Sequence, residues 1–235
     1  MDFKRKEIVV LIIVLILSTT IRAQQTTYCN PINIDYGYTP FKSFSSQGKH
    51  RATADPVIVN FQDKLFLFST NQEGYWWSAN MLDWNFVYRK FLRDDKYIHD
   101  LNAPAVWKMK DALYVYGSTW ESDFPIWKST NPTKDEWQIA LDTLKVGAWD
   151  PAFHYDEDTD DLYLYWGSSN VWPLLGTKIN TKTMQSEGYT KPILKLFPED
   201  HGWERFGEYN DNVFLQPFVE GCLLYTSDAA DDLLC

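Results

Sequence analysis

The stretch WDPAFHYDEDTDDLYLYWGSSN, residues 149–170, contains the unit that this chain repeats. It starts with an Asp-Pro pair, runs through a short apolar segment and an acidic turn, and ends after a second segment in which apolar and polar residues alternate. The related phrases ADPVIVNFQDKLFLFST and NAPAVWKMKDALYVYGST occupy residues 54–70 and 102–119. The prolines of the three phrases lie 48 and 47 residues apart along the chain. A nearly constant period of this length indicates repeated supersecondary units.

Each repeat holds enough strand-like segments for a four-stranded sheet. The three phrases form hairpins of β-branched and aromatic residues around turns at residues 62–64, 110–111 and 156–161, and no long stretch shows helical spacing. Two further strands are expected in each repeat, at residues 75–77 and 84–87, at 126–128 and 137–139 with a turn at 131–133, and at 176–179 with a weaker continuation near Tyr189. Four strands in about 45 residues are typical of a β-propeller blade.

The predicted fold is therefore an all-β propeller, of which this chain holds three blades and the first strand of a fourth. That strand is expected at residues 214–221, after an insertion at residues 191–211. A jelly roll or β-sandwich is the main alternative, and the regular spacing of the repeats argues against it. The partial propeller is expected to occupy residues 24–221.

Residues 1–23 have the pattern of a secretory signal peptide. A basic segment, Lys4-Arg5-Lys6, precedes an unbroken apolar run at residues 8–17, and the small residue Ala23 marks the expected cleavage site. The apolar run is shorter than the roughly 20 residues that a membrane-spanning helix needs. An uncleaved membrane anchor is the alternative. We expect an exported protein, periplasmic or extracellular, without stable insertion into a membrane after cleavage.

The C-terminal segment CLLYTSDAADDLLC, residues 222–235, lacks both strand alternation and turn residues. It resembles a translated sequencing adapter, so we expect it to be a non-native tail; a genuine acidic tail is the alternative. Of the three cysteines, Cys29 alone would then belong to the evolved protein. A single cysteine builds no disulfide framework.

The composition excludes some partners and favours others. The net charge is −10, and no basic run exists beyond the N-terminal one. Nucleic acid is therefore not expected as a partner, because phosphate binding needs Lys and Arg gathered on one face. The 11 Trp and 14 Tyr residues are many for 235 residues. Most such aromatics pack in cores, and the functional alternative is a set of flat faces on which sugar rings stack.

The residue before the repeat proline differs from one repeat to the next. It is Asp55 in the first, Ala103 in the second and Asp150 in the third, and Glu220 lies at the comparable place in the fourth. The innermost strands of a propeller converge on its axis, so these positions are expected to line one end of a central funnel. For each acid the structural alternative is a turn or cap carboxylate. If the fold required an acid at this position, the second repeat would need one too. Acids at only some of the equivalent positions therefore favour a catalytic role over a structural one.

Three carboxylates around one funnel suit glycoside hydrolysis. An inverting enzyme needs a base that activates water and an acid that protonates the leaving oxygen, about 6.5–9.5 Å apart. A third carboxylate can orient the acid and keep its pKa high. Other site types have no support, because the chain lacks a nucleophile elbow, an HExxH motif and a glycine-rich phosphate loop. The four histidines show no metal-ligand spacing, so no metal ligand is predicted from the residues themselves.

An ordered set of phrases makes the chain resemble glycoside hydrolase family 43, whose members are five-bladed propellers. The matching phrases, between residues 53 and 221, are TADPVIV, GYWWS, LDWNFV, NAPAVW, GAWDPAF, LYWGSSN, HGWERFGEYND and PFVEG. The resemblance implies that Asp55 is the general base, Asp150 the pKa modulator and orienter, and Glu220 the general acid. It implies inverting action on β-xylosides, α-L-arabinofuranosides or galactans. It further implies a calcium-like structural cation or a water cluster on the axis, held by a His of a later blade, and no other cofactor.

Three side chains are expected to contact the sugar. They are Trp149, Trp77 and Arg205. For the tryptophans the alternative is core packing, and for Arg205 it is an ion pair with Glu204 or Glu208. The alternative function is a carbohydrate-binding propeller without catalysis. A related retaining family would carry an Asn-Asp-Pro-Asn nucleophile strand, where this chain has Thr-Ala-Asp-Pro at residues 53–56.

Overall fold

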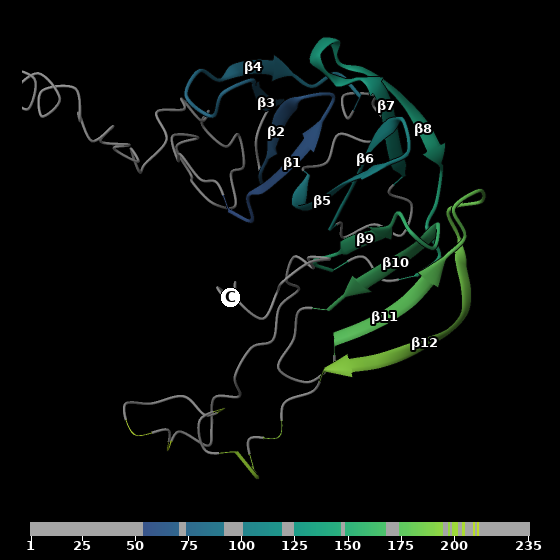
Figure 1. Cartoon of the computed structure of the whole chain (residues 1–235). Helices are drawn as coiled ribbons and strands as arrows, with labels where there is room; N and C mark the ends of the chain where they lie inside the picture. Colours follow the sequence, from purple (N-terminus) through teal and green to yellow (C-terminus); the bar gives the residue numbers. More distant parts are fainter. Residues whose placement is uncertain are drawn as a thin grey trace, which may run out of the picture. The chain divides into compact units, whose positions relative to one another are not determined.

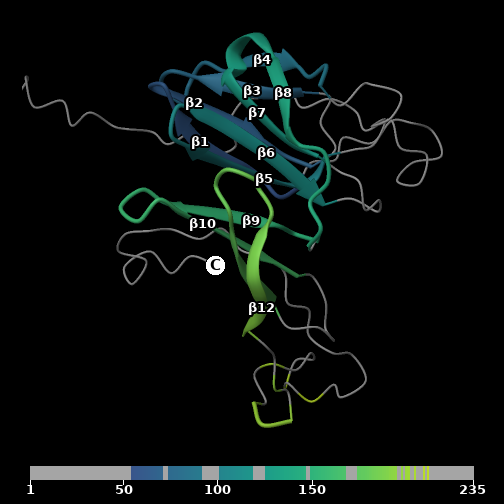
Figure 2. The same ribbon diagram turned by 90° about the vertical axis from the view of Figure 1, so that its right-hand side faces the viewer.

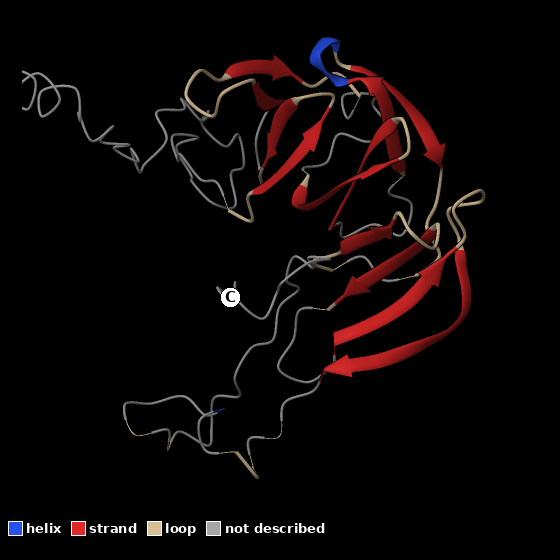
Figure 3. Cartoon of the chain, viewed as in Figure 1, coloured by secondary structure: helices blue, strands red, loops and turns tan. Residues whose placement is uncertain are grey.

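The computed structural model describes residues 54–70, 74–91, 101–118, 125–146, 149–167 and 174–194, with residues 197, 199–201, 204, 209 and 211. These residues form an all-β fold of three four-stranded antiparallel sheets, each built from four strands consecutive in sequence (Figures 1 and 3). The first sheet contains β1 (Val57–Phe61), β2 (Lys64–Phe68), β3 (Gly74–Ser78) and β4 (Asn85–Tyr88). The second contains β5 (Asn102–Met109), β6 (Ala112–Ser118), β7 (Ile126–Asn131) and β8 (Glu136–Leu141). The third contains β9 (Ala152–Asp156), β10 (Asp161–Trp166), β11 (Leu174–Ile179) and β12 (Ser186–Leu194).

This topology confirms the predicted blades. Each sheet is an up-and-down meander, and its strand order follows the chain from the first strand to the fourth. The first strands of successive sheets contact one another, β1 with β5 and β5 with β9. Figure 2 shows the same three sheets from the side. Consecutive four-stranded meanders joined through their first strands are the construction of a β-propeller.

Tight turns fix the register of the first two hairpins. Phe61 pairs with Lys64 across the two-residue turn Gln62-Asp63, and both turn residues have positive φ, 51° and 56°. Two residues in the left-handed region form the turn whose twist matches that of a hairpin. In the second hairpin Met109 pairs with Ala112 around Lys110, whose φ is 55°. The first strand β1 alternates in burial, with Val57 and Phe61 buried, whereas most residues of β5 and β6 are buried.

The acidic turn of the third blade, between β9 and β10, is held by its own carboxylates. Asp156 accepts hydrogen bonds from the backbone N–H groups of Asp158 and Thr159, at 2.9 and 3.3 Å. The pKa of the Asp156 carboxyl is lowered chiefly by a hydrogen bond from the side chain of Thr159, and further by these two backbone bonds. Asp160 accepts a hydrogen bond from the hydroxyl of Tyr155 at 2.7 Å, and this contact raises the pKa of Tyr155 to about 12.

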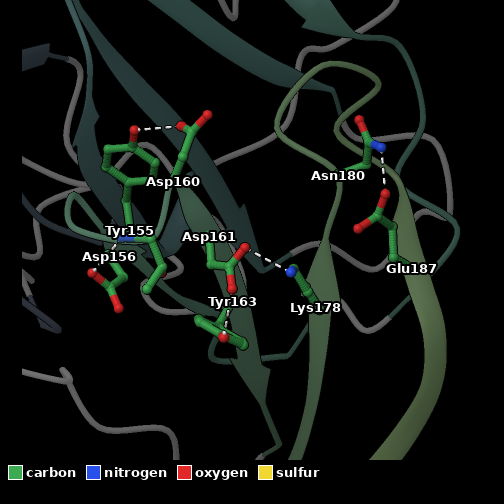
Figure 4. A network of polar contacts seen from close by, with 9 residues as sticks. Tyr155, Asp156, Asp160, Asp161, Tyr163, Lys178, Asn180 and Glu187 are labelled. Carbon is green, nitrogen blue, oxygen red and sulfur yellow. Dashed lines mark hydrogen bonds and ion pairs between the residues drawn. The ribbon is translucent and has the colours of Figure 1, made fainter.

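Side chains next to this turn pair across the strands of the third blade (Figure 4). Lys178 lies 2.6 Å from Asp161, which also accepts the hydroxyl of Tyr163 at 3.2 Å. Asn180 donates to Glu187 across the β11–β12 turn. Lys110 of the second blade reaches Asp160 at 3.0 Å. The acidic turn is therefore a partnered surface feature, in which each exposed pair contributes little to stability.

The junction between the first two blades contains a buried tyrosine. Tyr75, on β3, is fully buried and donates its hydroxyl to the carbonyl of Pro132, at 2.5 Å. Pro132 begins the 3-10 helix η2 (Pro132–Lys134), which joins β7 to β8 at the turn predicted for residues 131–133. Trp137 of β8 donates its indole N–H to the same tyrosine oxygen, at 3.0 Å. The hydroxyl of Tyr75, from the first blade, is thus hydrogen-bonded to two groups of the second blade within apolar packing, as burial of a hydroxyl requires.

Aromatic stacking joins the second and third blades. Trp107 on β5 and Phe153 on β9 lie face to face, with ring centroids 4.0 Å apart and planes 11° from parallel. Tyr114 of β6 also stacks against Trp107, with ring centroids 5.3 Å apart. Both Trp107 and Phe153 are buried. Close aromatic pairs stabilise a fold by more than the burial of their apolar area alone. This stack is therefore a main contact between the blades.

The fourth strand of the third blade differs from expectation. The weak continuation near Tyr189 is the nine-residue strand β12, and it includes residues 191–194, which were predicted to begin the insertion. The prediction was wrong because eight of its nine residues are exposed, so the strand carries no alternation of apolar and polar residues. Its pairing with β11 is irregular, with register shifts at Leu174/Leu175 and Gly176/Lys178.

Several predicted segments lie outside the described residues. They are the signal peptide at 1–23, the fourth-blade strand at 214–221, Glu220, Arg205 and the tail at 222–235. These assignments, and the boundaries of the partial propeller, stay predictions. Within the described ranges, no helix has both the length and the apolar character needed to cross a membrane.

Removing the ring of Phe153 tests the junction between the second and third blades. We expect Phe153→Ala to lower the free energy of unfolding by about 3–5 kcal/mol, because loss of the ring that stacks on Trp107 leaves a cavity. Tyr189→Ala is the control: that side chain is 91% exposed, and we expect a change of about 0.5 kcal/mol or less. Denaturant unfolding measures both, and equal effects of the two substitutions would contradict the assignment.

Replacing Asp135 with Asn tests the first junction through its pH dependence. Burial raises the pKa of this carboxyl, which accepts the N–H of Lys90 at 2.7 Å. The folded state therefore holds the proton more tightly than the unfolded chain, so wild type loses stability as the pH rises through the pKa of the folded state. Asn has no such loss. We expect the stability of the variant relative to wild type to increase between about pH 3 and about pH 7.

The measurement is denaturant unfolding at several pH values, with the exposed Asp142→Asn as the matched control. A stability difference for Asp135→Asn that falls with rising pH, or that follows the control, would contradict the assignment.

Candidate functional site

The turns that lead into the three innermost strands have the same strained backbone. The residue before each proline, here called the pre-proline residue, is Asp55, Ala103 or Asp150, and its φ is 50°, 39° or 44°. Positive φ is uncommon for residues other than glycine, and a following proline restricts the backbone further. Three repeats that share this conformation place their pre-proline side chains in equivalent positions. The alignment of Asp55, Ala103 and Asp150 made from the sequence is therefore also an alignment of the backbone.

A backbone hydrogen bond closes the turn in the first and third blades. The N–H of Thr70 donates to the carbonyl of Ala54, and the N–H of Gly167 donates to the carbonyl of Trp149, both at 2.9 Å. In each case the donor follows the second strand and the acceptor precedes the acid. The residue that follows the second strand thus binds the backbone just before the acid in both blades.

Two hydroxyl groups bind these turns from the end of the second strand. The hydroxyl of Thr70 donates to Oδ2 of Asp55 at 2.6 Å and accepts the N–H of Ala103, in the next blade, at 2.8 Å. The hydroxyl of Ser118, at the equivalent position of the second blade, accepts the N–H of Asp150 at 2.8 Å. It lies 3.5 Å from Oδ1 of the same Asp150. Each hydroxyl therefore connects one blade to the pre-proline residue of the next.

Neither hydroxyl was among the residues singled out from the sequence. A signal was present, since Thr70 and Ser118 lie two residues beyond the strand residues that pair with Val57 and Ala105. Ser and Thr are common in turns for many reasons, so their presence alone indicates no site. Gly167 occupies the same position in the third blade and has no hydroxyl to offer.

The predicted site residues differ in their surroundings. Asp55 is exposed and Asp150 is half-buried. Trp149, next to Asp150, is 41% exposed, which leaves part of its ring available to a ligand. Trp77 is half-buried and packs against the core from β3, with Nζ of Lys64 5.9 Å from its ring. Trp149 thus keeps the accessibility that a stacking platform needs, whereas the contacts of Trp77 are those of a packing residue; the sugar contact of each stays a prediction.

The remaining predicted features concern residues that the structure does not describe. Glu220 and Arg205 are outside the described ranges. The described residues contain no group of three or more His, Cys, Asp or Glu side chains able to hold a metal ion. The axial cation implied by the family resemblance, held by a His of a later blade, stays a prediction, and no chemical step is assigned to it.

Solved structures with a similar fold are glycoside hydrolases. An α-L-arabinofuranosidase from Clostridium thermocellum has a TM-score of 0.50 and 15% identity over 60% of this chain and 55% of its own. An exo-1,5-α-L-arabinanase from a bovine ruminal metagenomic library has a TM-score of 0.46 and 19% identity, over 60% of this chain and 55% of its own. A family 43 β-xylosidase/α-arabinofuranosidase from a compost microbial metagenome has a TM-score of 0.48 and 15% identity, over 61% of this chain and 59% of its own.

The chain spans a little over half the length of these structures. No protein-family model and no curated protein sequence matches the chain. At such low identity the likeness to the arabinofuranosidase establishes the fold. The all-β propeller architecture expected from the sequence, and its resemblance to family 43 enzymes at the level of fold, are thereby confirmed.

Ala103→Gly tests whether the pre-proline turn is strained. An L-residue in the left-handed region costs about 1–2 kcal/mol, and glycine relieves this cost while adding about 0.5–1 kcal/mol of backbone entropy. We expect the free energy of unfolding to increase by about 0.5–1 kcal/mol. The control is Ala105→Gly, two residues later in β5; Ala105 itself has no positive φ, so this substitution should lower stability. Denaturant unfolding measures both, and a loss of stability in Ala103→Gly equal to that of the control would contradict the strain.

Proposed function

We propose that the chain carries three blades of an exported glycoside hydrolase of family 43 that inverts configuration at the anomeric carbon. The observation that supports this most directly is the pair of acids, Asp55 and Asp150, in equivalent turns at the entries of β1 and β9. The equivalent residue of the second blade, Ala103, shares the positive φ and lies near the start of β5. Acids at two of the three equivalent positions favour a task other than folding, because Ala103 adopts the positive φ without one.

In the proposed reaction the roles of the carboxylates follow from the single-displacement mechanism. Asp55 takes a proton from a water molecule as the water oxygen forms a bond to the anomeric carbon. The bond between that carbon and the leaving oxygen breaks, and Glu220 donates a proton to this oxygen. Asp150 orients Glu220 and keeps it protonated until transfer. One bond forms and one breaks on opposite faces of the sugar, so the configuration inverts.

The substrates that we propose are β-xylosides, α-L-arabinofuranosides or galactans. Structures with a similar fold are named as arabinofuranosidase, arabinanase and xylosidase. An exposed tryptophan beside the third-blade acid, Trp149, suits stacking against a sugar ring, with Trp77 and Arg205 as further proposed contacts. The export signal proposed for residues 1–23 fits a polymeric substrate outside the cell.

The stereochemistry of the first product tests the mechanism. The protein expressed from a completed reading frame, with all blades of the propeller, is incubated with aryl β-xyloside and aryl α-L-arabinofuranoside, and proton NMR records which anomer appears before mutarotation. We expect the inverted anomer, and retention would rule out the single displacement.

Loss of the base tests the assignment of Asp55. We expect Asp55→Asn to lower kcat by about 10²–10⁴-fold, the range of general-base catalysis. Asp63→Asn, a hairpin-turn carboxylate in the same blade, is the control and should keep wild-type kcat. A carbohydrate-binding propeller without catalysis would show no turnover in any variant and unchanged oligosaccharide affinity in Asp55→Asn.

A further inference from the structure

We propose that Thr70 is the positioning residue of Asp55: its hydroxyl fixes Oδ2 of the carboxylate and ties it to the backbone of the second blade. The proposal rests on the proposed function, in which Asp55 is the general base. Thr70 is half-buried and follows β2, so its own position is set by the hairpin and not by the carboxylate.

Two contacts of the Thr70 hydroxyl indicate where its hydrogen points. A hydroxyl has one hydrogen to donate and two lone pairs to accept with. The N–H of Ala103 can only donate, so it occupies a lone pair of Oγ1 at 2.8 Å. A carboxylate can only accept, so the hydrogen points to Oδ2 of Asp55 at 2.6 Å. This distance is in the range of a charge-assisted O–H···O bond, which is roughly twice as strong as a neutral one.

The contact leaves the other carboxylate oxygen for the reaction. Within the described ranges, Oδ2 of Asp55 is bound by Thr70 and no described residue binds Oδ1. Rotation of the carboxyl group would break the bond to Thr70, so this bond holds the carboxylate in one orientation. A base held in one orientation loses less entropy when it takes a proton from water, which is the benefit of positioning in catalysis.

The second junction shows that this pairing is specific to Asp55. Ser118 accepts the N–H of Asp150 as Thr70 accepts that of Ala103, both at 2.8 Å. The pre-proline residue of its own blade is Ala103, so Ser118 has no carboxylate there to bind. Its distance to Oδ1 of Asp150 is 3.5 Å, at the limit of a hydrogen bond. The first junction alone therefore combines the strong bond to an acid with the bond to the next blade.

The single hydrogen of Thr70 also explains why the second repeat carries alanine. A carboxylate at position 103 would lie beside Thr70, as that of Asp150 lies beside Ser118. Because the hydrogen of Thr70 is committed to Asp55, the new carboxylate would find no donor there and would repel the first one. Alanine before the second proline keeps the hydroxyl for Asp55.

The test compares variants that remove or keep the hydroxyl. Thr70→Val has the same shape without the hydroxyl, Thr70→Ala removes it without crowding, and Thr70→Ser keeps it. Thr177→Val is the matched control, because it removes a buried hydroxyl that bonds Ser186 between β11 and β12, away from Asp55. Steady-state kinetics on an aryl glycoside give kcat and KM for each variant.

We expect Thr70→Val and Thr70→Ala to lower kcat by about tenfold to a hundredfold with KM nearly unchanged, as loss of a hydrogen bond to a charged group predicts. Thr70→Ser should retain kcat within about threefold, and Thr177→Val should keep wild-type kcat. Wild-type kcat in Thr70→Val or Thr70→Ala would overturn the proposal, as would an equal loss in Thr70→Ser.

A second measurement on the same chain is independent of turnover. NMR follows the carboxyl ¹³C resonance of Asp55 and the hydrogen exchange of the Ala103 amide. We expect the resonance to move and the exchange to accelerate in Thr70→Val and Thr70→Ala, but not in Thr177→Val. If wild type hydrolyses no glycoside, the proposed function fails while these NMR results still decide whether Thr70 holds Asp55. Unchanged NMR signals would overturn the positioning.

Discussion

At the start of each of the three described innermost strands lies a residue with a strained backbone, and the candidate site depends on this constraint. A non-glycine residue with positive φ before a proline costs about 1–3 kcal/mol. Asp55, Ala103 and Asp150 all adopt this conformation, so contacts around the turns must offset the cost three times. The bonds from Thr70 to Ala54 and from Gly167 to Trp149 are such contacts. The strain is useful because it directs the pre-proline side chain away from the core into which the following strand runs.

The hydroxyl contacts make the geometry of the site a property of neighbouring blades. Thr70 and Ser118 each belong to one blade and bind a backbone N–H of the next. The orientation of each acid thus depends on how two sheets are packed. That packing is maintained by the buried stack of Trp107 on Phe153 and by the buried Tyr75 hydroxyl. Core packing and site geometry are therefore coupled through contacts of only a few atoms.

The sequence allowed most of the architecture to be predicted. The hairpins of the three described repeats were predictable because their strands are rich in β-branched and aromatic residues and the turns that join them are recognisable in the sequence. Strand β12 was underestimated because its residues are nearly all exposed. The positive φ of the pre-proline residues had no sequence signal, since glycine is the residue that usually reveals it. The roles of Thr70 and Ser118 require three-dimensional contacts with Ala103 and Asp150, which no local pattern encodes.

The exposed outer strand β12 has a consequence for how the protein behaves in concentrated solution. Among the described strands it pairs with β11 alone, so its other edge presents backbone groups that a second molecule can match. Pro192 lacks an N–H, Lys191 adds a charge, and the register shifts opposite Leu174 and Gly176 bend the strand. These interruptions oppose edge-to-edge growth into fibres. The features that limit edge pairing thus lie in a segment that contributes almost nothing to the core.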